Sequence, residues 1–130
     1  MNKPKIKSFE DLKVWQKARE LANLVYDATD NFPKNERFGL IDQIRRAVVS
    51  VSANIAEGFS RYHLKESILF YRNSRGSLSE LKSHFYIAYD RKYLKRQEFD
   101  RIFELIDEVG KMLNGLINST NSFRKDTKLK

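Results

Sequence analysis

The chain has 130 residues, with no cysteine, two histidines and a formal net charge of +8 at pH 7. This length is sufficient for one domain with a hydrophobic core of its own. The absence of cysteine excludes disulfides, cysteine-based zinc sites and thiol catalysis, and two histidines leave little for imidazole chemistry. No apolar segment approaches the length of a membrane span or the pattern of a signal peptide, so we expect a cytoplasmic protein without a membrane partner.

The positive charge is concentrated at the two ends of the sequence. Residues 1–8 and residues 119–130 each carry a net charge of +3, which leaves +2 for residues 9–118. We predict two basic tails, of which the C-terminal one has few apolar residues to pack and is expected to be disordered or frayed. Such tails either keep a protein soluble or contact a polyanion, and both interpretations stay open.

Apolar residues recur at helical spacing in the first half of the chain. The first pattern predicts a helix over about residues 10–30, with Ser8 as its N-cap and Pro33 beyond its end. The second pattern runs from Lys34 to Glu57. The glycine that follows, Gly58, is predicted to end this helix in the left-handed C-cap conformation.

The second half repeats this organisation. The helical period resumes after His63 and continues to about Tyr89, and a fourth pattern runs from Phe99 to Leu116. Four helices with short connections and no alternation of the strand type predict an all-α fold, an antiparallel up-down-up-down four-helix bundle over residues 9–118.

A polar stripe follows the second predicted helix and faces small and polar residues on the third. The residues of this predicted seam are Gln43, Arg46, Ser50, Asn54, Glu57, Ser74, Arg75, Ser77 and Glu80. An antiparallel pairing of the two helices places Arg46 near Glu80, so we predict that they pair and that the seam fixes the packing register. The alternative is a ligand pocket for an anion. Gly76, inside the third helix, is interpreted as a close approach of another helix backbone.

The sequence lacks the arrangements that familiar enzymes use. A di-iron four-helix bundle requires Glu-x-x-His pairs, and neither His63 nor His84 has a glutamate three residues before it. There is also no Gly-x-Ser-x-Gly motif. We therefore expect a protein that is not an enzyme and has no metal, cofactor or catalytic residue.

The densest basic cluster surrounds Tyr93, between the third and fourth predicted helices. Its members are Arg91, Lys92, Lys95 and Arg96. Repeated around an oligomer, such a cluster can bind a polyanion that one copy would hold weakly, so these residues are candidate nucleic-acid contacts. A solvated loop is the alternative interpretation.

The second predicted helix has more apolar surface than one core requires. Ile41, Val49 and Ala56 widen its apolar face beyond the arc of about 100° that a single core covers. These three residues are candidates for an interface between subunits.

Several motifs resemble the family of four-helix proteins encoded by intervening sequences within bacterial 23S rRNA genes. The resemblance covers roughly residues 8–118. It rests on Phe9-Glu10-Asp11-Leu12, Val14-Trp15-Gln16-Lys17-Ala18, Tyr26, Phe32-Pro33, Glu36, Gly39-Leu40, Gln43-Ile44-Arg45-Arg46-Ala47, Ser50-Val51-Ser52-Ala53-Asn54-Ile55-Ala56-Glu57-Gly58 and Arg75-Gly76-Ser77-Leu78-Ser79-Glu80-Leu81.

This resemblance implies a four-helix bundle that assembles into a homopentameric ring. Relatives of the family include the accessory variability determinant of diversity-generating retroelements, whose basic surface is implicated in binding nucleic acid and a reverse transcriptase. The sequence and the resemblance together predict a homo-oligomeric scaffold that binds RNA or DNA, and with it a nucleic-acid enzyme. The alternatives are a protein-interaction module without nucleic acid and a binder of a small ligand in the channel of the oligomer.

Overall fold

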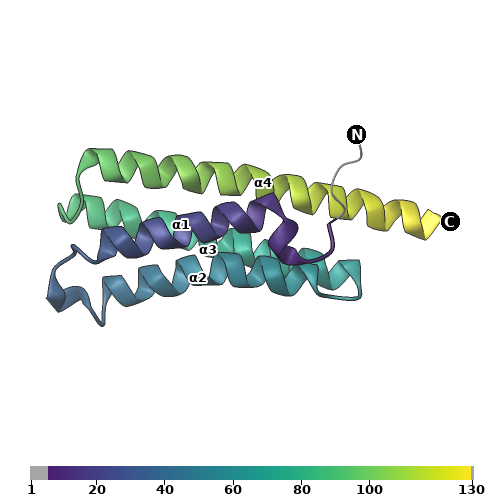
Figure 1. The fold of residues 1–130 in the computed structure, drawn as a ribbon, viewed down its shortest axis with the longest axis horizontal. Helices are drawn as coiled ribbons and strands as arrows, with labels where there is room; N and C mark the ends of the chain where they lie inside the picture. Colours follow the sequence, from purple (N-terminus) through teal and green to yellow (C-terminus); the bar gives the residue numbers. More distant parts are fainter. Residues whose placement is uncertain (1–5, 130) are drawn as a thin grey trace.

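The computed structural model of the chain describes residues 6–129, with side chains described for residues 6–126. Consecutive α-helices run antiparallel along the long axis of the molecule (Figure 1). The connection from α1 to α2 and the turn from α3 to α4 lie at one end, and the turn from α2 to α3 lies at the other. The elements in chain order are η1 (Phe9–Asp11), α1 (Lys13–Thr29), η2 (Lys34–Glu36), α2 (Leu40–Phe59), α3 (Leu64–Asp90) and α4 (Arg96–Leu129).

The four helices pack against one another around one main core. Each described helix packs beside its two neighbours, α1 closes the bundle against α4, and the backbones of the diagonal pairs lie farther apart in the described residues. The pair α2 and α3 packs most extensively. Fully buried side chains come from all four helices: Leu21, Val25, Ile44, Val48, Val51, Ile55, Leu81, Phe85, Ile102, Val109 and Leu113. The all-α, four-helix prediction is confirmed.

The chain enters α1 differently from the prediction. Ser8 precedes the short helix η1, and its backbone N–H donates to Asp11 Oδ2 at 3.3 Å. α1 begins only at Lys13, because Leu12 is extended (φ −76°, ψ 124°) and turns a side chain that is 7% exposed into the core. Burial of Leu12 therefore interrupts the helix that the acidic residues of the first turn predicted.

The bounds of α2 also differ from the prediction at both ends. Residues 34–36 form the separate short helix η2, and α2 begins after Gly39. Gly58 is not a left-handed cap, because it lies inside α2 and no glycine in the described chain has a positive φ. It is buried, and a Cβ at this position would lie 2.7 Å from the Tyr71 ring. Gly58 thus serves close packing rather than termination.

The close approach predicted at Gly76 is not found there. A Cβ added to Gly76 would meet nothing within 4 Å in the described chain, and the residue is exposed. The helical period places Gly76 two residues from buried Ser74 and Leu78, on the outer face of α3. The narrow contact between α2 and α3 is made at Gly58 instead.

A left-handed residue does end α3, but it is a lysine. Lys92 has φ 64°, its N–H donates to Tyr89 O at 2.9 Å, and the N–H of Tyr93 donates to Ala88 O at 3.0 Å. These two bonds make a Schellman motif, which satisfies the last carbonyls of the helix. The Tyr93 hydroxyl then donates to Glu36 Oε2 at 2.9 Å, which ties this turn to η2.

α4 is longer than its apolar pattern predicted. Residues 119–129, expected to form a disordered tail, are helical in the structure and continue α4 past the start of α3 and beyond the end of the bundle (Figure 1). Ile117 is buried with Ile68 and Tyr71 of α3, and the Thr120 hydroxyl donates to Leu116 O at 2.7 Å. This satellite cluster extends the helix beyond the main core. Of the predicted N-terminal tail, residues 1–5 lie outside the described residues.

None of the helices described within residues 6–129 combines the length and the apolar character that crossing a bilayer requires.

Candidate functional site

The interface between α2 and α3 contains a short row of hydrogen-bonded polar side chains, which we call the serine seam: Ser50, Asn54, Ser74 and Ser77. The Ser50 and Ser77 hydroxyls lie 2.9 Å apart, and Asn54 Nδ2 donates to Ser50 O at 2.8 Å. Ser74 is fully buried and donates to Val51 O at 2.7 Å. Each of these four side chains makes a hydrogen bond within the interface, so the row contributes packing geometry.

Five of the residues predicted for the polar seam do not join it. The Arg46 side chain is 80% exposed and its Nε donates to Asp42 Oδ2 at 3.1 Å, so the predicted pair with Glu80 is wrong. An acid one turn earlier on the same helix is a closer partner than one across the interface. Glu80 lies 3.9 Å from His84 Nε2. The others are also exposed: Gln43, Glu57 in contact with Arg61, and Arg75.

A second row of polar residues lies on the other side of α3, along its interface with α4. It contains six cations, of which Lys82 is paired with Asp107. We call the other five the basic seam: Lys65, Arg72 and Arg75 of α3 with Lys111 and Arg124 of α4. Within the described part of the chain, none of the five forms an ion pair with a carboxylate. The seam therefore keeps its positive charge available to a partner.

A constant antiparallel register holds the basic seam straight. Arg75 Nη1 donates to Asn114 Oδ1 at 3.0 Å, and about two turns along the interface Lys82 Nζ lies 3.5 Å from Asp107 Oδ1. At the far end the rings of Tyr86 and Phe103 meet edge to face, with centroids 4.8 Å apart. Two cavities follow this interface, of about 360 Å³ near Arg124 and about 310 Å³ near Lys111.

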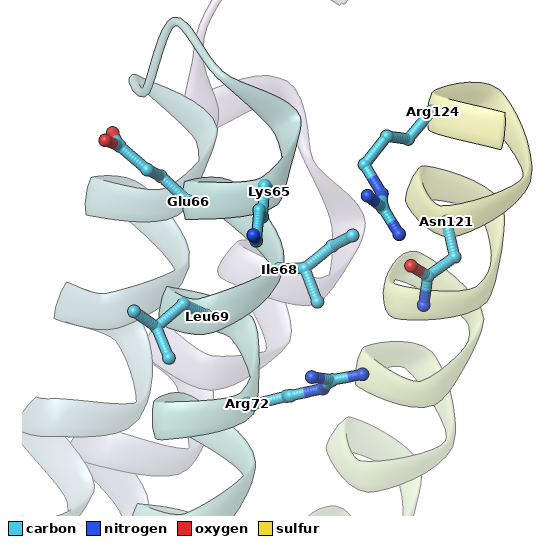
Figure 2. Close-up of a pocket in the computed structure, with 7 residues that line it drawn as sticks. All are labelled: Lys65, Glu66, Ile68, Leu69, Arg72, Asn121 and Arg124. Atoms are coloured by element: carbon cyan, nitrogen blue, oxygen red, sulfur yellow. The ribbon is translucent and has the colours of Figure 1, made fainter. Parts of the chain in front are cut away.

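The larger cavity lies between the first turns of α3 and the last turns of α4 (Figure 2). Arg72 and Arg124 reach into the space between the two helices, Lys65 lines the cavity from the first turns of α3, and the carboxylate of Glu66 points away from it. Asn121 adds an amide from α4, and Ile68 forms the apolar floor between them. Three cations thus line one hollow that has no inward-facing acid.

One polar atom of this cavity has no protein partner. The Arg124 Nε is buried, and it donates no hydrogen bond to any group in the described part of the chain. A buried N–H without an acceptor costs about 1 to 3 kcal/mol, and more when the group is charged. An anion in the cavity would supply that acceptor.

The predicted nucleic-acid contacts in the α3–α4 turn lie at the opposite end of the bundle from this cavity (Figure 1). Arg91, Lys92 and Lys95 are exposed. Arg96 is already engaged, because hydrogen bonds to Tyr89 and then to Asp100 raise its pKa and its Nε lies 2.9 Å from Asp100 Oδ1. All four therefore stay candidate contacts, and Arg96 differs from the other three in having an ion pair with an acid of its own helix.

The predicted interface residues lie on α2, on the side of the bundle formed with α1. Val49 is 45% exposed, Ala56 is half-buried, and Ile41 packs against the main core. Nearby apolar side chains are also exposed, with Phe38 at 89% and Tyr26 at 39%. The apolar surface therefore extends beyond the three residues that the sequence indicated.

Comparison with known proteins identifies the family. Residues 10–115 match the 23S rRNA-intervening sequence protein family. The chain belongs to this family. The predicted family is thus confirmed, and the match ends before the last turns of α4, which contribute Asn121 and Arg124 to the larger cavity.

A solved structure supports the fold of this family member. It is the crystal structure of a protein with unknown function from the S23 ribosomal protein family of Bacteroides thetaiotaomicron VPI-5482, with a TM-score of 0.74. The two chains are 22% identical, and the match covers 81% of this chain and 95% of the other. No functionally curated protein is similar enough in sequence to match.

Sequence reasoning missed Lys65, Arg72, Lys111 and Arg124 as a group. They are far apart in the sequence, and only the register of α3 against α4 brings them together. One available signal was the spacing of Lys65 and Arg72, which places two cations on one face of a helix two turns apart. Arg124 gave no such signal, because it lies in the C-terminal segment that the sequence did not predict to be helical.

Proposed function

We propose that this protein is a non-enzymatic, homo-oligomeric scaffold that binds nucleic acid along the basic seam. The observation that carries the proposal is the row of cations without carboxylate partners along the interface of α3 and α4. Lysine and arginine side chains arranged in this way neutralise phosphates, and the release of counterions then drives binding. Exposed Arg91, Lys92 and Lys95 extend the contact at the other end of the molecule.

The length of the basic seam suits a short stretch of one strand. From Lys111 to Arg124 the rise along α4 is about 20 Å, at about 1.5 Å per residue. One strand of a duplex presents a phosphate every 3.4 Å or so, so the seam spans about six of them. Contacts of this kind fix position and supply affinity without reading the base sequence.

Oligomerisation would multiply this modest seam. The exposed apolar side chains Tyr26 and Val49 line one hollow between α1 and α2, and exposed Phe38 lies in the connection between these two helices. A neighbouring copy seated there leaves every basic seam accessible. Several seams on one particle bind a long polyanion much more tightly than a single seam does.

The salt dependence of binding tests the proposal directly. Fluorescence anisotropy with labelled RNA and DNA at 50 to 200 mM salt is expected to give a log–log slope of about −3 to −5 for five phosphate contacts. The double substitution R72Q/R75Q should make the slope less negative by about two. The control R19Q/R101Q removes the same charge from exposed residues outside the seam and should leave the slope unchanged. Absence of binding at 50 mM salt by the folded protein overturns the proposal.

The proposed assembly is tested by light scattering. A particle of several times 15.4 kDa is expected for the unmodified chain, and V49E should reduce it to the single chain with its helical circular dichroism retained. The control Q97E places the same charge on an exposed residue at the start of α4. A mass of one chain for the unmodified protein contradicts the oligomeric part of the proposal and leaves the salt experiment to decide the rest.

A further inference from the structure

We infer that the larger cavity, between Lys65, Arg72 and Arg124, is a binding site for a phosphate dianion of the phosphomonoester type. The group is presented either by the terminal phosphate of a nucleic-acid strand or by free inorganic phosphate. The first source rests on the proposed function, and the second does not. The inference deepens that function by naming what the end of the basic seam recognises.

The charges of the cavity favour a dianion over a single backbone phosphate. Three cations from two helices line the same cavity, two of them reaching into the space between the helices, and the one carboxylate of the lining, Glu66, points away from it (Figure 2). A phosphodiester carries one negative charge, whereas a terminal phosphate carries nearly two at pH 7. Elsewhere along the seam the cations stand in an open row, and there Lys82 has Asp107 as its partner.

The donor set also fits a tetrahedral oxyanion. Arg72 and Arg124 present planar guanidinium forks from opposite helices, and such forks bind phosphate oxygens in pairs. The amide of Asn121 lies beside them, and the buried Nε of Arg124 has no acceptor in the described chain. An oxygen of the phosphate would accept a hydrogen bond from this N–H, which explains why the Nε atom of Arg124 is buried there without a partner.

The position of the cavity suits the end of a strand. It lies where α3 begins and α4 ends, at the end of the bundle that holds the α2–α3 turn (Figure 1). A strand running along the basic seam reaches this cavity last. Its terminal phosphate would enter the hollow, while the preceding phosphates contact Arg75 and Lys111 along the interface.

Two measurements on the full-length protein test the inference. The first compares the anisotropy of one oligonucleotide sequence with a 5′-phosphate, a 3′-phosphate or hydroxyls at both ends. We expect one of the phosphorylated forms to bind at least about fivefold tighter than the hydroxyl form, as one additional charge-assisted contact provides. The second titrates inorganic phosphate and follows saturable binding by calorimetry.

Matched variants locate any effect in the cavity. R124Q should abolish the preference for a terminal phosphate and the binding of inorganic phosphate, and K65Q should weaken both. K125Q removes the same charge from the exposed neighbouring residue and should preserve both. Because Arg124 lies in the last turns of α4, circular dichroism checks that R124Q keeps its helix, and K65Q tests the cavity from α3 independently.

The outcomes separate the two sources and the two proposals. A terminal-phosphate preference lost in R124Q supports the inference with nucleic acid as the source, and inorganic phosphate binding alone, lost in R124Q, supports it with the free ion. No binding of inorganic phosphate and no terminal preference overturns it, even when the hydroxyl oligonucleotide binds through the rest of the seam. Failure of all oligonucleotides to bind overturns the proposed function, and the phosphate titration still decides the cavity.

Discussion

The helix α3 carries two rows of polar residues, and the rows differ in whether their polar groups have partners within the protein. Toward α2 it presents Ser74 and Ser77, which are hydrogen-bonded within a tight interface. Toward α4 it presents Lys65 and Arg72, which are exposed and have no carboxylate partner in the described chain. The same helix therefore uses short hydroxyl side chains where a neighbour comes close and long cationic ones where the interface opens.

This difference separates structure from function within one helix. A polar row whose groups satisfy each other stabilises the fold and has little capacity left for a ligand. A row of unpaired cations repels itself and weakens the fold slightly, so its presence calls for an external partner. Substitutions in the serine seam should change stability, and substitutions in the basic seam should change binding.

The largest expected effect is at the closest contact of α2 with α3. In Gly58→Ala the new Cβ would lie 2.7 Å from the Tyr71 ring, and we expect the free energy of unfolding to fall by about 2 kcal/mol through overpacking. The control Gly76→Ala has free space and should raise it by about 1 kcal/mol through helix propensity. Urea unfolding followed by circular dichroism measures both. Equal effects from the two alanines would show that the interface is not tight at Gly58.

A smaller effect concerns Tyr71, which lies against Gly58 and also packs with Ile68 and Ile117 beside the larger cavity. Burial raises the pKa of Tyr71 to about 12, while a tyrosine in the unfolded chain ionises near pH 10. The unfolded state therefore loses its proton first, and stability falls as the pH rises from 10 toward 12. At pH 11 the raised pKa of Tyr71 lowers the free energy of unfolding by about 1.4 kcal/mol. In Tyr71→Phe the free energy of unfolding should lack this decrease between pH 9 and pH 11. The same decrease in the variant and the unmodified protein would show that Tyr71 is in contact with water.

The adjacent residues Ser74 and Arg75 provide the sharpest test, because they face different seams. Ser74→Ala removes a fully buried hydrogen bond to Val51 O and should lower stability by about 1 kcal/mol without changing oligonucleotide affinity. Arg75→Gln should change stability by less than about 0.5 kcal/mol, since the residue is exposed. It should instead weaken oligonucleotide binding. The reverse pattern would exchange the roles of the two seams.

Helical periodicity was sufficient to predict the fold. Leu21, Val48, Leu81 and Leu113 all occupy buried positions of their helices, as the spacing of apolar residues indicated. The residues at which helices begin and end were harder to predict, because tertiary contacts decide them. Leu12 interrupts the first helix to reach the core, and burial of Ile117 against α3 supports the continuation of α4.

Of the two polar rows, the sequence predicted only the one between α2 and α3. The antiparallel packing of α2 on α3 was foreseen, and it brings Ser50 to Ser77. Whether Arg46 pairs across the interface or along its own helix depends on rotamers, which periodicity does not determine. The basic seam depends on the register of α4 against α3, which the apolar spacing within each helix does not determine.

The lysine at the end of α3 offers a practical advantage. Lys92 holds a left-handed backbone at φ 64°, a conformation that costs an L-residue roughly 1 kcal/mol and glycine almost nothing. Most charge-removing substitutions leave doubt about whether a lost activity reflects the charge or a loosened fold. At this position a glycine removes the charge and relaxes the backbone at the same time. The turn therefore contains a site where charge can be removed while the Schellman motif is retained.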